Sequence, residues 1–129
     1  VVWLLPILPF INDTEENLPG VLDYCVLGKV RGIICFGFGV TLREGNREYF
    51  YSKLDEHFPG MKQKYIRTFG NNYECGSPNK ARLYEIFKDE CRNNNILYMP
   101  DDVFTYLHRF EQKERQMTLF DVMGVNHAN

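Results

Sequence analysis

The side chains in this chain that could bind a metal or attack a substrate are four cysteines and three histidines. The cysteines lie at least ten positions apart, so no two have the CxxC or similar spacing of a metal site: Cys25, Cys35, Cys75 and Cys91. His57, His108 and His127 fall in separate segments, without a cysteine or carboxylate at ligand spacing. The pattern indicates no metal site and favours reduced, buried thiols, as in a cytoplasmic protein.

Two further patterns suggest a phosphate-binding loop and an acid–base pair, and each has a simpler interpretation. The segment 37–39 (GFG) begins like GxGxxG, but Leu42 stands where the third glycine is required. Glycines at the end of a strand more often allow close backbone approach. Asp101 and Asp102 stand at an expected helix start, which favours a capping role over catalysis.

Two apolar runs predict the strands that would position any functional site. Residues 1–5 and 32–36 are apolar on both faces, as is typical of buried parallel strands. Between them, apolar residues at helical spacing predict a helix that Gly28 ends: Leu18, Val21, Leu22, Cys25 and Val26. This order favours a right-handed β–α–β unit and therefore an α/β fold with a parallel sheet.

Helical patterns continue through the rest of the chain. Asp13 or Thr14 is expected to cap the first helix, where Asp13 with Glu16 resembles a capping box, and Thr41 with Glu44 predicts a second helix start. Further helices are expected over 61–69, from Ser77 onwards and from 100 onwards, with 70–76 as a polar loop and 96–99 as a short extended stretch.

Composition and charge argue against a disordered chain, a long-range electrostatic nucleic-acid binder and a membrane-spanning protein. The chain has 129 residues, 44% of them hydrophobic, which is enough for a buried core. A formal net charge of −2 attracts no nucleic acid at long range, so such a contact would require a local basic patch. No apolar run approaches the roughly 18 residues that span a bilayer, so no membrane is expected as a partner.

Ligands in parallel α/β proteins bind beyond the carboxyl ends of the strands. The polar residues at that rim are Asn12, Asp13, Thr41 and Arg43. The alternative role of Asp13 and Thr41 is helix capping. Arg43, expected in the first turn of a helix, opposes the helix dipole, which is consistent with a role in meeting an anion.

Three segments resemble radical S-adenosylmethionine proteins. Residues 3–17 (WLLPILPFINDTEEN) resemble their fifth-strand segment, and 32–36 (GIICF) with 41–47 (TLREGNR) look like the sixth strand and following helix. Residues 73–78 and the tail are similar to a spore photoproduct lyase-like subgroup. The resemblance covers nearly the whole chain. It implies a fragment of a partial (β/α)6 TIM-like barrel: residues 1–60 would supply two parallel strands with helices, 61–110 a helical extension, and 111–129 a flexible tail.

The resemblance also implies cofactors and a reaction class. The parent enzyme would bind S-adenosylmethionine and a [4Fe–4S] cluster held by CxxxCxxC, a motif that leaves one iron free for the cofactor. That motif is absent here and is expected upstream of Val1, so the chain alone is expected to hold no cofactor and to be an inactive fragment of a lyase-like enzyme. Its substrate is unknown, with DNA repair-like chemistry on nucleic acid as a candidate.

Residue positions follow from the same resemblance. The fifth-strand segment lies near the adenine of the cofactor, which assigns Ile7, Pro9, Asn12 and Asp13 to cofactor binding. Thr41 and Arg43 would lie close to substrate or cofactor at the top of the sixth strand. No catalytic residue is assigned. The expected partner of this segment is the N-terminal part of the barrel.

The tail supports an alternative function, a docking module without chemistry of its own. Residues 116–120 (QMTLF) look like the QLxLF peptide by which bacterial repair proteins bind the DNA sliding clamp. Leu119 and Phe120 would enter an apolar pocket while Gln116 hydrogen-bonds at its edge. The competing interpretation is a tail that packs on its own domain.

Open strand edges also predict self-association. Two parallel strands without neighbours would expose edges that pair readily with other chains. We therefore expect this chain to associate with itself or to rearrange its first strand.

Overall fold

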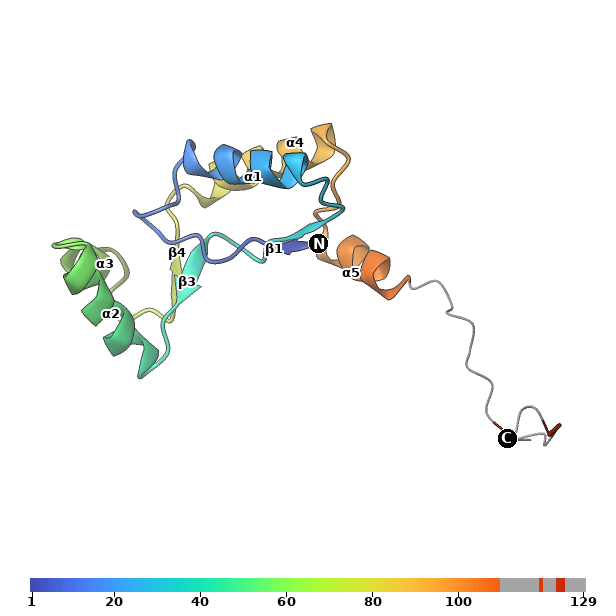
Figure 1. Cartoon of the computed structure of the whole chain (residues 1–129). Coiled ribbons are helices and arrows are strands. Elements are labelled where there is room, and N and C mark those ends of the chain that lie inside the picture. Colours follow the sequence, from blue (N-terminus) through green and yellow to red (C-terminus); the bar gives the residue numbers. More distant parts are fainter. Residues whose placement is uncertain (110–118, 120–122, 125–129) are drawn as a thin grey trace.

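The computed structural model describes residues 1–109, 119, 123 and 124. In that part the elements are β1 (Val2–Trp3), α1 (Asn17–Leu27), β2 (Ile33–Ile34), β3 (Gly39–Thr41), α2 (Asn46–His57), α3 (Met61–Phe69), β4 (Glu74–Gly76), α4 (Lys80–Asn93) and α5 (Pro100–His108). Figure 1 shows α1 and α4 side by side over the strands, with α2 and α3 at one end and α5 at the other. The fold is mixed α/β.

The two apolar runs are neighbouring parallel strands, as predicted. Val2 pairs with Ile33 and Trp3 with Ile34. On the other edge of β2, Leu97 forms a parallel bridge with Gly32. The stretch expected to be extended therefore continues the parallel arrangement by one residue pair. The β–α–β prediction is confirmed.

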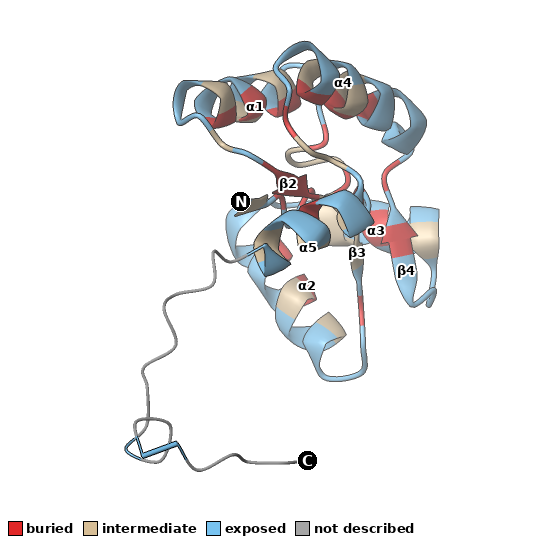
Figure 2. Ribbon diagram, turned by 90° about the vertical axis from the view of Figure 1, so that its right-hand side faces the viewer, coloured by how far each residue is buried: buried red, intermediate tan, exposed pale blue. Residues whose placement is uncertain are grey.

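A first core, which we call the helix-pair core, lies between these strands and α1 with α4 (Figure 2). It forms because each helix has one apolar face and the strands are apolar on the side that faces the helices. Its buried members are Leu4, Ile7, Leu18, Leu22, Cys25, Ile33, Phe38, Leu83, Phe87, Cys91 and Ile96.

The second sheet was not predicted. β3 and β4 form an antiparallel pair in which Gly39 lies opposite Gly76 and Thr41 opposite Glu74. A Cβ at Gly39 would lie 2.5 Å from the carbonyl oxygen of Cys75, so this strand crossing requires a glycine. The loop expected over 70–76 therefore contains a strand.

A second core, the hairpin core, packs this sheet against α2 and α3. Its buried members are Leu42, Tyr51, Leu54, Tyr65 and Cys75. The Arg47 guanidinium fastens the chain beside it by donating hydrogen bonds to the carbonyl oxygens of Leu42 at 3.1 Å and Asn72 at 2.8 Å. These bonds fix the segment between α3 and β4 although it has little regular structure.

Two helix starts differ from the capping-box patterns. Thr41 lies in β3 and not at a helix start, and α2 begins at Asn46 after Gly45, so Arg43 is not in a first helical turn. At α1, the Asn17 amide bonds to the Thr14 hydroxyl and Asp13 lies outside the helix. Capping boxes are short local patterns, and strand pairing with β4 overrides the one at Thr41.

The segment 6–13 joins the two cores. The Tyr65 hydroxyl donates a buried hydrogen bond of 2.7 Å to the Pro9 carbonyl oxygen. At the end of the same segment, the Ser77 hydroxyl donates to the Asp13 carboxylate at 2.5 Å; these side chains are 2% and 3% exposed. Both bonds connect residues more than fifty positions apart and hold the segment in one conformation.

No helix in the described part of the chain combines the length and the apolar character that crossing a membrane requires.

Replacing Ser77 by alanine tests the hydrogen bond between Ser77 and Asp13, which helps to connect the two cores. The Asp13 carboxylate would lose its hydroxyl partner in a buried position, so we expect the free energy of unfolding to fall by about 1–3 kcal/mol in urea titrations. Ser52→Ala is the matched control, because its hydroxyl bonds to Tyr49 at the surface. Equal losses in both variants would contradict the assigned role.

Candidate functional site

A hollow of about 440 Å³ opens at the carboxyl ends of β1 and β2. Leu5 follows the first strand and Phe36 the second, and both line it. The remaining lining residues come from β3, β4 and the start of α4: Gly37, Phe38, Gly39, Val40, Thr41, Glu74, Cys75, Gly76 and Lys80. Ligands of parallel α/β proteins bind at this end of the strands.

Glycines leave one wall of the hollow without side chains. A Cβ at Gly37 would meet nothing within 4 Å, and one at Gly76 would meet only the Cδ atom of Lys80, at 3.9 Å. Leu5 and Phe36 provide an apolar wall, and Phe36 is 61% exposed. Such a surface accepts a flat, weakly polar group.

Two opposite charges line the same hollow. Glu74 belongs to β4, and Lys80 is the first residue of α4. Neither side chain forms an ion pair with another residue in the part of the chain that the structure describes. Both charges therefore remain free, within that part, to meet charges on a ligand.

The structure places the predicted residues of the first loop in its packing. Ile7 and Pro9 are buried. The Asn12 carboxamide accepts a hydrogen bond from the Leu8 amide and donates one to the Pro6 carbonyl oxygen, and Asp13 bonds to Ser77. None of the four side chains lines the hollow, whereas Thr41 does.

Arg43 does not line the hollow; it follows β3 and bonds to Tyr73. Its Nε atom donates to the phenol oxygen at 3.0 Å, and its guanidinium lies 5.9 Å from the centre of the ring. The hydrogen bond and positive charge of Arg43 lower the pKa of Tyr73, with a contribution from Thr41. The strand pair thus brings together Thr41, Arg43 and Tyr73, of which only the first two were predicted.

The sequence contains a signal for some of the other lining residues that were not predicted, and none for the rest. Leu5 and Phe36 could have been found, because each is the last residue of a predicted strand. Glu74 and Lys80 could not, since nothing in the polar sequence 70–76 indicates a strand that would carry them to the same place.

All four cysteines are free thiols and lie in the described part of the chain. Within residues 1–109 and the few described beyond them, no three cysteine, histidine or acidic side chains gather closely enough to hold an ion. Burial raises the pKa of all four thiols, that of Cys91 to about 12. Neutral, packed thiols are poor ligands for an iron–sulfur cluster.

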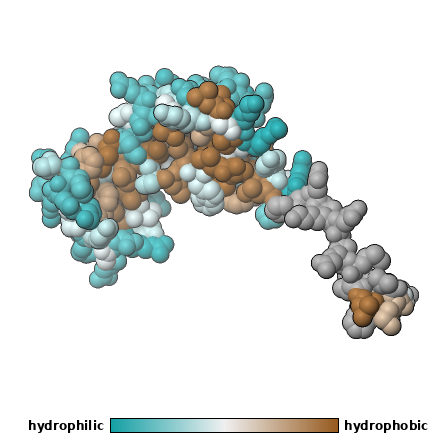
Figure 3. All heavy atoms as spheres, viewed as in Figure 1, coloured by the Kyte–Doolittle hydropathy of each residue, from teal (hydrophilic) through white to brown (hydrophobic). Residues whose placement is uncertain are grey.

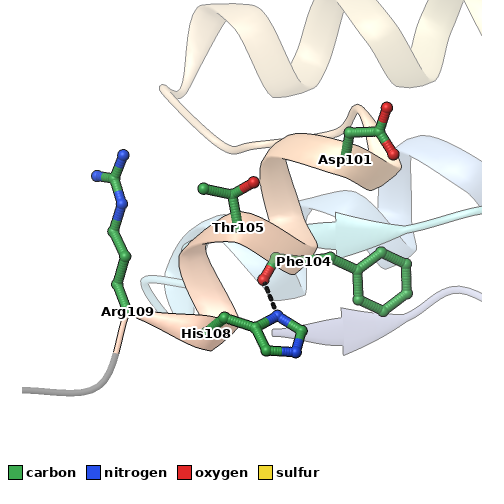
Figure 4. Close-up of a pocket in the computed structure, with 5 residues that line it drawn as sticks. All are labelled: Asp101, Phe104, Thr105, His108 and Arg109. Carbon is green, nitrogen blue, oxygen red and sulfur yellow. Dashed lines mark hydrogen bonds between the residues drawn. The ribbon is translucent and has the colours of Figure 1, made fainter.

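A second hollow of about 590 Å³ lies along α5 (Figure 4). Asp101, Phe104, Thr105, His108 and Arg109 line it, so all its walls come from one helix and the residue after it. The Nδ1 atom of His108 is occupied by the carbonyl oxygen of Phe104, at 2.6 Å. The side chains do not converge on a common point, and this hollow is the weaker candidate.

The predicted clamp-binding residues lie mainly outside the described part of the chain. Gln116 and Phe120 are not among the described residues, whereas Leu119 is described and is 72% exposed.

Comparison with known proteins adds no assignment. No protein-family model matches the chain, and no match was found among curated proteins or solved structures.

Replacing Arg43 by methionine tests its contact with Tyr73. A nearby positive charge stabilises the phenolate, so its loss should raise the pKa of Tyr73 towards the ordinary value of 10.0. A pH titration of the Tyr73 ring resonances by NMR measures this change. Arg67→Met is the control, and the same tyrosine pKa in both variants would contradict the contact.

Proposed function

We propose that this chain is part of a radical S-adenosylmethionine enzyme of the spore photoproduct lyase-like subgroup, and that the hollow beyond β1 and β2 forms one wall of its cofactor site. The observation that carries the proposal is the parallel pairing of β1 and β2, whose carboxyl ends open onto one hollow. A partial (β/α)6 barrel would be completed by further parallel strands beside β1. Residues 1–60 would then supply its last two strands.

The hollow fits part of S-adenosylmethionine by size and chemistry. Its volume lies within the range of about 300–1,000 Å³ typical of small-molecule sites. Leu5 and Phe36 offer apolar surface for the adenine ring, and Glu74 offers a negative charge near which the sulfonium would be stabilised. Thr41 could hydrogen-bond to the ribose.

The [4Fe–4S] cluster does not fit the cysteines of this chain: Cys25, Cys75 and Cys91 are buried, Cys35 is partly buried, and within the described residues they do not gather into a ligand set. In the proposed enzyme it would be held by protein outside residues 1–129. Bound to such a cluster, S-adenosylmethionine would supply radical chemistry to the proposed enzyme. This chain would contribute apolar surface that excludes water, charges at the rim and the Arg43–Tyr73 pair, and would be inactive by itself.

Binding of S-adenosylmethionine to this chain tests the cofactor wall. Because the chain would offer only part of the site, we expect weak, millimolar binding, equivalent to about −4 kcal/mol. In NMR titrations the amide shifts should be confined to residues 5, 36–41 and 74–80, which include the lining of the hollow. Phe36→Ala should abolish them, because it removes the exposed ring of the apolar wall.

The control for this experiment is Phe58→Ala, which removes an exposed phenylalanine beyond α2. Shifts that spread over the whole chain, or that survive Phe36→Ala, would reject the assigned wall. The reaction class is tested separately. A parent protein that contains this sequence should show an iron–sulfur absorbance band after anaerobic purification, and a parent without CxxxCxxC would remove the radical chemistry.

A second candidate function is docking of the tail on a bacterial sliding clamp. The observation in its favour is the exposure of Leu119, which leaves this side chain available to a partner. Such a role would need no chemistry from the hollow and is compatible with a repair enzyme as the parent.

A peptide covering residues 113–121 tests this second function. Leu119→Ala and Phe120→Ala should each weaken binding to a bacterial sliding clamp by at least about tenfold, since apolar anchors dominate such interfaces. Thr118→Ala is the control, because that position is variable in QLxLF. If Leu119→Ala and Phe120→Ala bind as tightly as the control peptide, the docking function is rejected.

A further inference from the structure

A third hollow, of about 230 Å³, lies before β2, whereas the hollow of the candidate site lies beyond the carboxyl end of that strand. It forms where α1 and α4 both end, and Figure 1 shows the two helices ending on the same side. We call it the helix-end hollow. Its lining residues are Val26, Lys29, Val30, Arg31, Asn94, Asn95 and Ile96.

The two helices end in the same way, with the paired backbone hydrogen bonds of a Schellman motif. The amide donors and carbonyl acceptors are Val30 to Cys25 and Lys29 to Val26 at α1, and Ile96 to Cys91 and Asn95 to Arg92 at α4. Backbone amides therefore satisfy these carbonyl groups at both helix ends. The two cations of the hollow, Lys29 and Arg31, are not needed to cap them.

Lys29 has an unfavourable backbone conformation for a lysine. Its φ is 53°, in the left-handed region that the Schellman motif requires at this position. Glycine or asparagine normally stands there, and α4 has Asn95 with a φ of 54°. The turn itself therefore does not favour a lysine. Strain of this kind collects at functional positions, and Lys29 lines the hollow.

Strand pairing fixes the backbone of Arg31. Its carbonyl oxygen accepts a hydrogen bond from the Leu97 amide at 2.9 Å, and the Ile33 amide donates to the Leu97 carbonyl oxygen at 2.8 Å. Both bonds belong to the parallel bridge between Gly32 and Leu97. The guanidinium is therefore attached to a rigid part of the sheet, as a preorganised binding group should be.

The polar side chains of the hollow offer positive charge and hydrogen-bond donors. Lys29 and Arg31 are cations and Asn95 carries an amide, whereas the Asn94 amide already donates to the Glu90 carbonyl oxygen. No acidic side chain of the described part lines this hollow, although each of the other two hollows includes one. Neither cation forms an ion pair with another described residue. Figure 3 shows strongly hydrophilic side chains where the two helices end.

We propose that the helix-end hollow binds a terminal phosphate group, as in a phosphate monoester. A planar arginine fork beside a lysine point charge suits the charge and the oxygen atoms of phosphate. The volume lies below the range of about 300–1,000 Å³ typical of sites for whole small molecules, so the rest of the ligand would stay outside. A backbone phosphodiester fits less well, because two of its oxygens carry substituents.

Titration of the intact chain with inorganic phosphate and with glycerol phosphate, at constant ionic strength, tests this site by NMR. We expect saturable amide shifts confined to residues 26–31 and 94–97, with a dissociation constant of about 1 mM. Arg31→Gln should weaken binding at least about fivefold, because it removes charge-assisted hydrogen bonds. Lys29→Asn should have the same effect without disturbing the turn, since asparagine tolerates a positive φ.

Arg67→Gln is the matched control, because Arg67 is an exposed arginine on α3 that forms no ion pair with a described residue. Shifts that stay linear with phosphate concentration, or that Arg31→Gln and Lys29→Asn leave unchanged, overturn the proposal. A single-stranded oligonucleotide without a terminal phosphate should cause no shifts at these residues, and equal binding would overturn the assignment to a terminal phosphate. No titration contains S-adenosylmethionine, so failure here leaves the proposed function standing.

Discussion

The structure depends on two buried hydrogen bonds that hold the segment between β1 and α1. The Tyr65 hydroxyl fastens the middle of this segment to α3, and the Ser77 hydroxyl fastens its end to the start of α4. Neither core contains both of these attachment points. A buried carboxylate without a partner would cost free energy, so the segment is held where Asp13 can meet Ser77. This arrangement sets the position of the hairpin core relative to the helix-pair core.

Much of the helix-pair core could be read from the sequence, because it follows periodic patterns. The apolar runs ending at Leu5 and Phe36 identify two strands, and the spacing from Leu18 to Cys25 identifies the helix between them. Parallel pairing follows from that order. The pairing of β3 with β4 could not be read, since it joins two three-residue segments whose paired residues, from Gly39–Gly76 to Thr41–Glu74, lie about 35 positions apart. Its register depends on tertiary packing around Tyr65, which no local pattern encodes.

The candidate site could likewise be predicted only in part from the sequence. The rule that ligands bind beyond strand ends points to the carboxyl ends of β1 and β2, and Thr41 lines the hollow that lies there. It does not predict which side chains face the hollow, because Asn12 and Asp13 satisfy backbone and hydroxyl groups within the protein instead. A polar residue near a site can hydrogen-bond either to a ligand or to other residues of the protein. The sequence does not distinguish these two roles, whereas the atomic positions do. The capping pattern at Thr41 failed for a related reason, since strand pairing took precedence.

The attachment of the segment 6–13 to two distant elements has a consequence for engineering. Its polar atoms are already satisfied within the protein, so substitutions there would disturb the scaffold before they altered recognition. Leu5, Phe36, Glu74 and Lys80 carry no comparable internal hydrogen bonds among the described residues. A library that diversifies these four positions and keeps the segment unchanged would sample new ligand preferences with little loss of foldability.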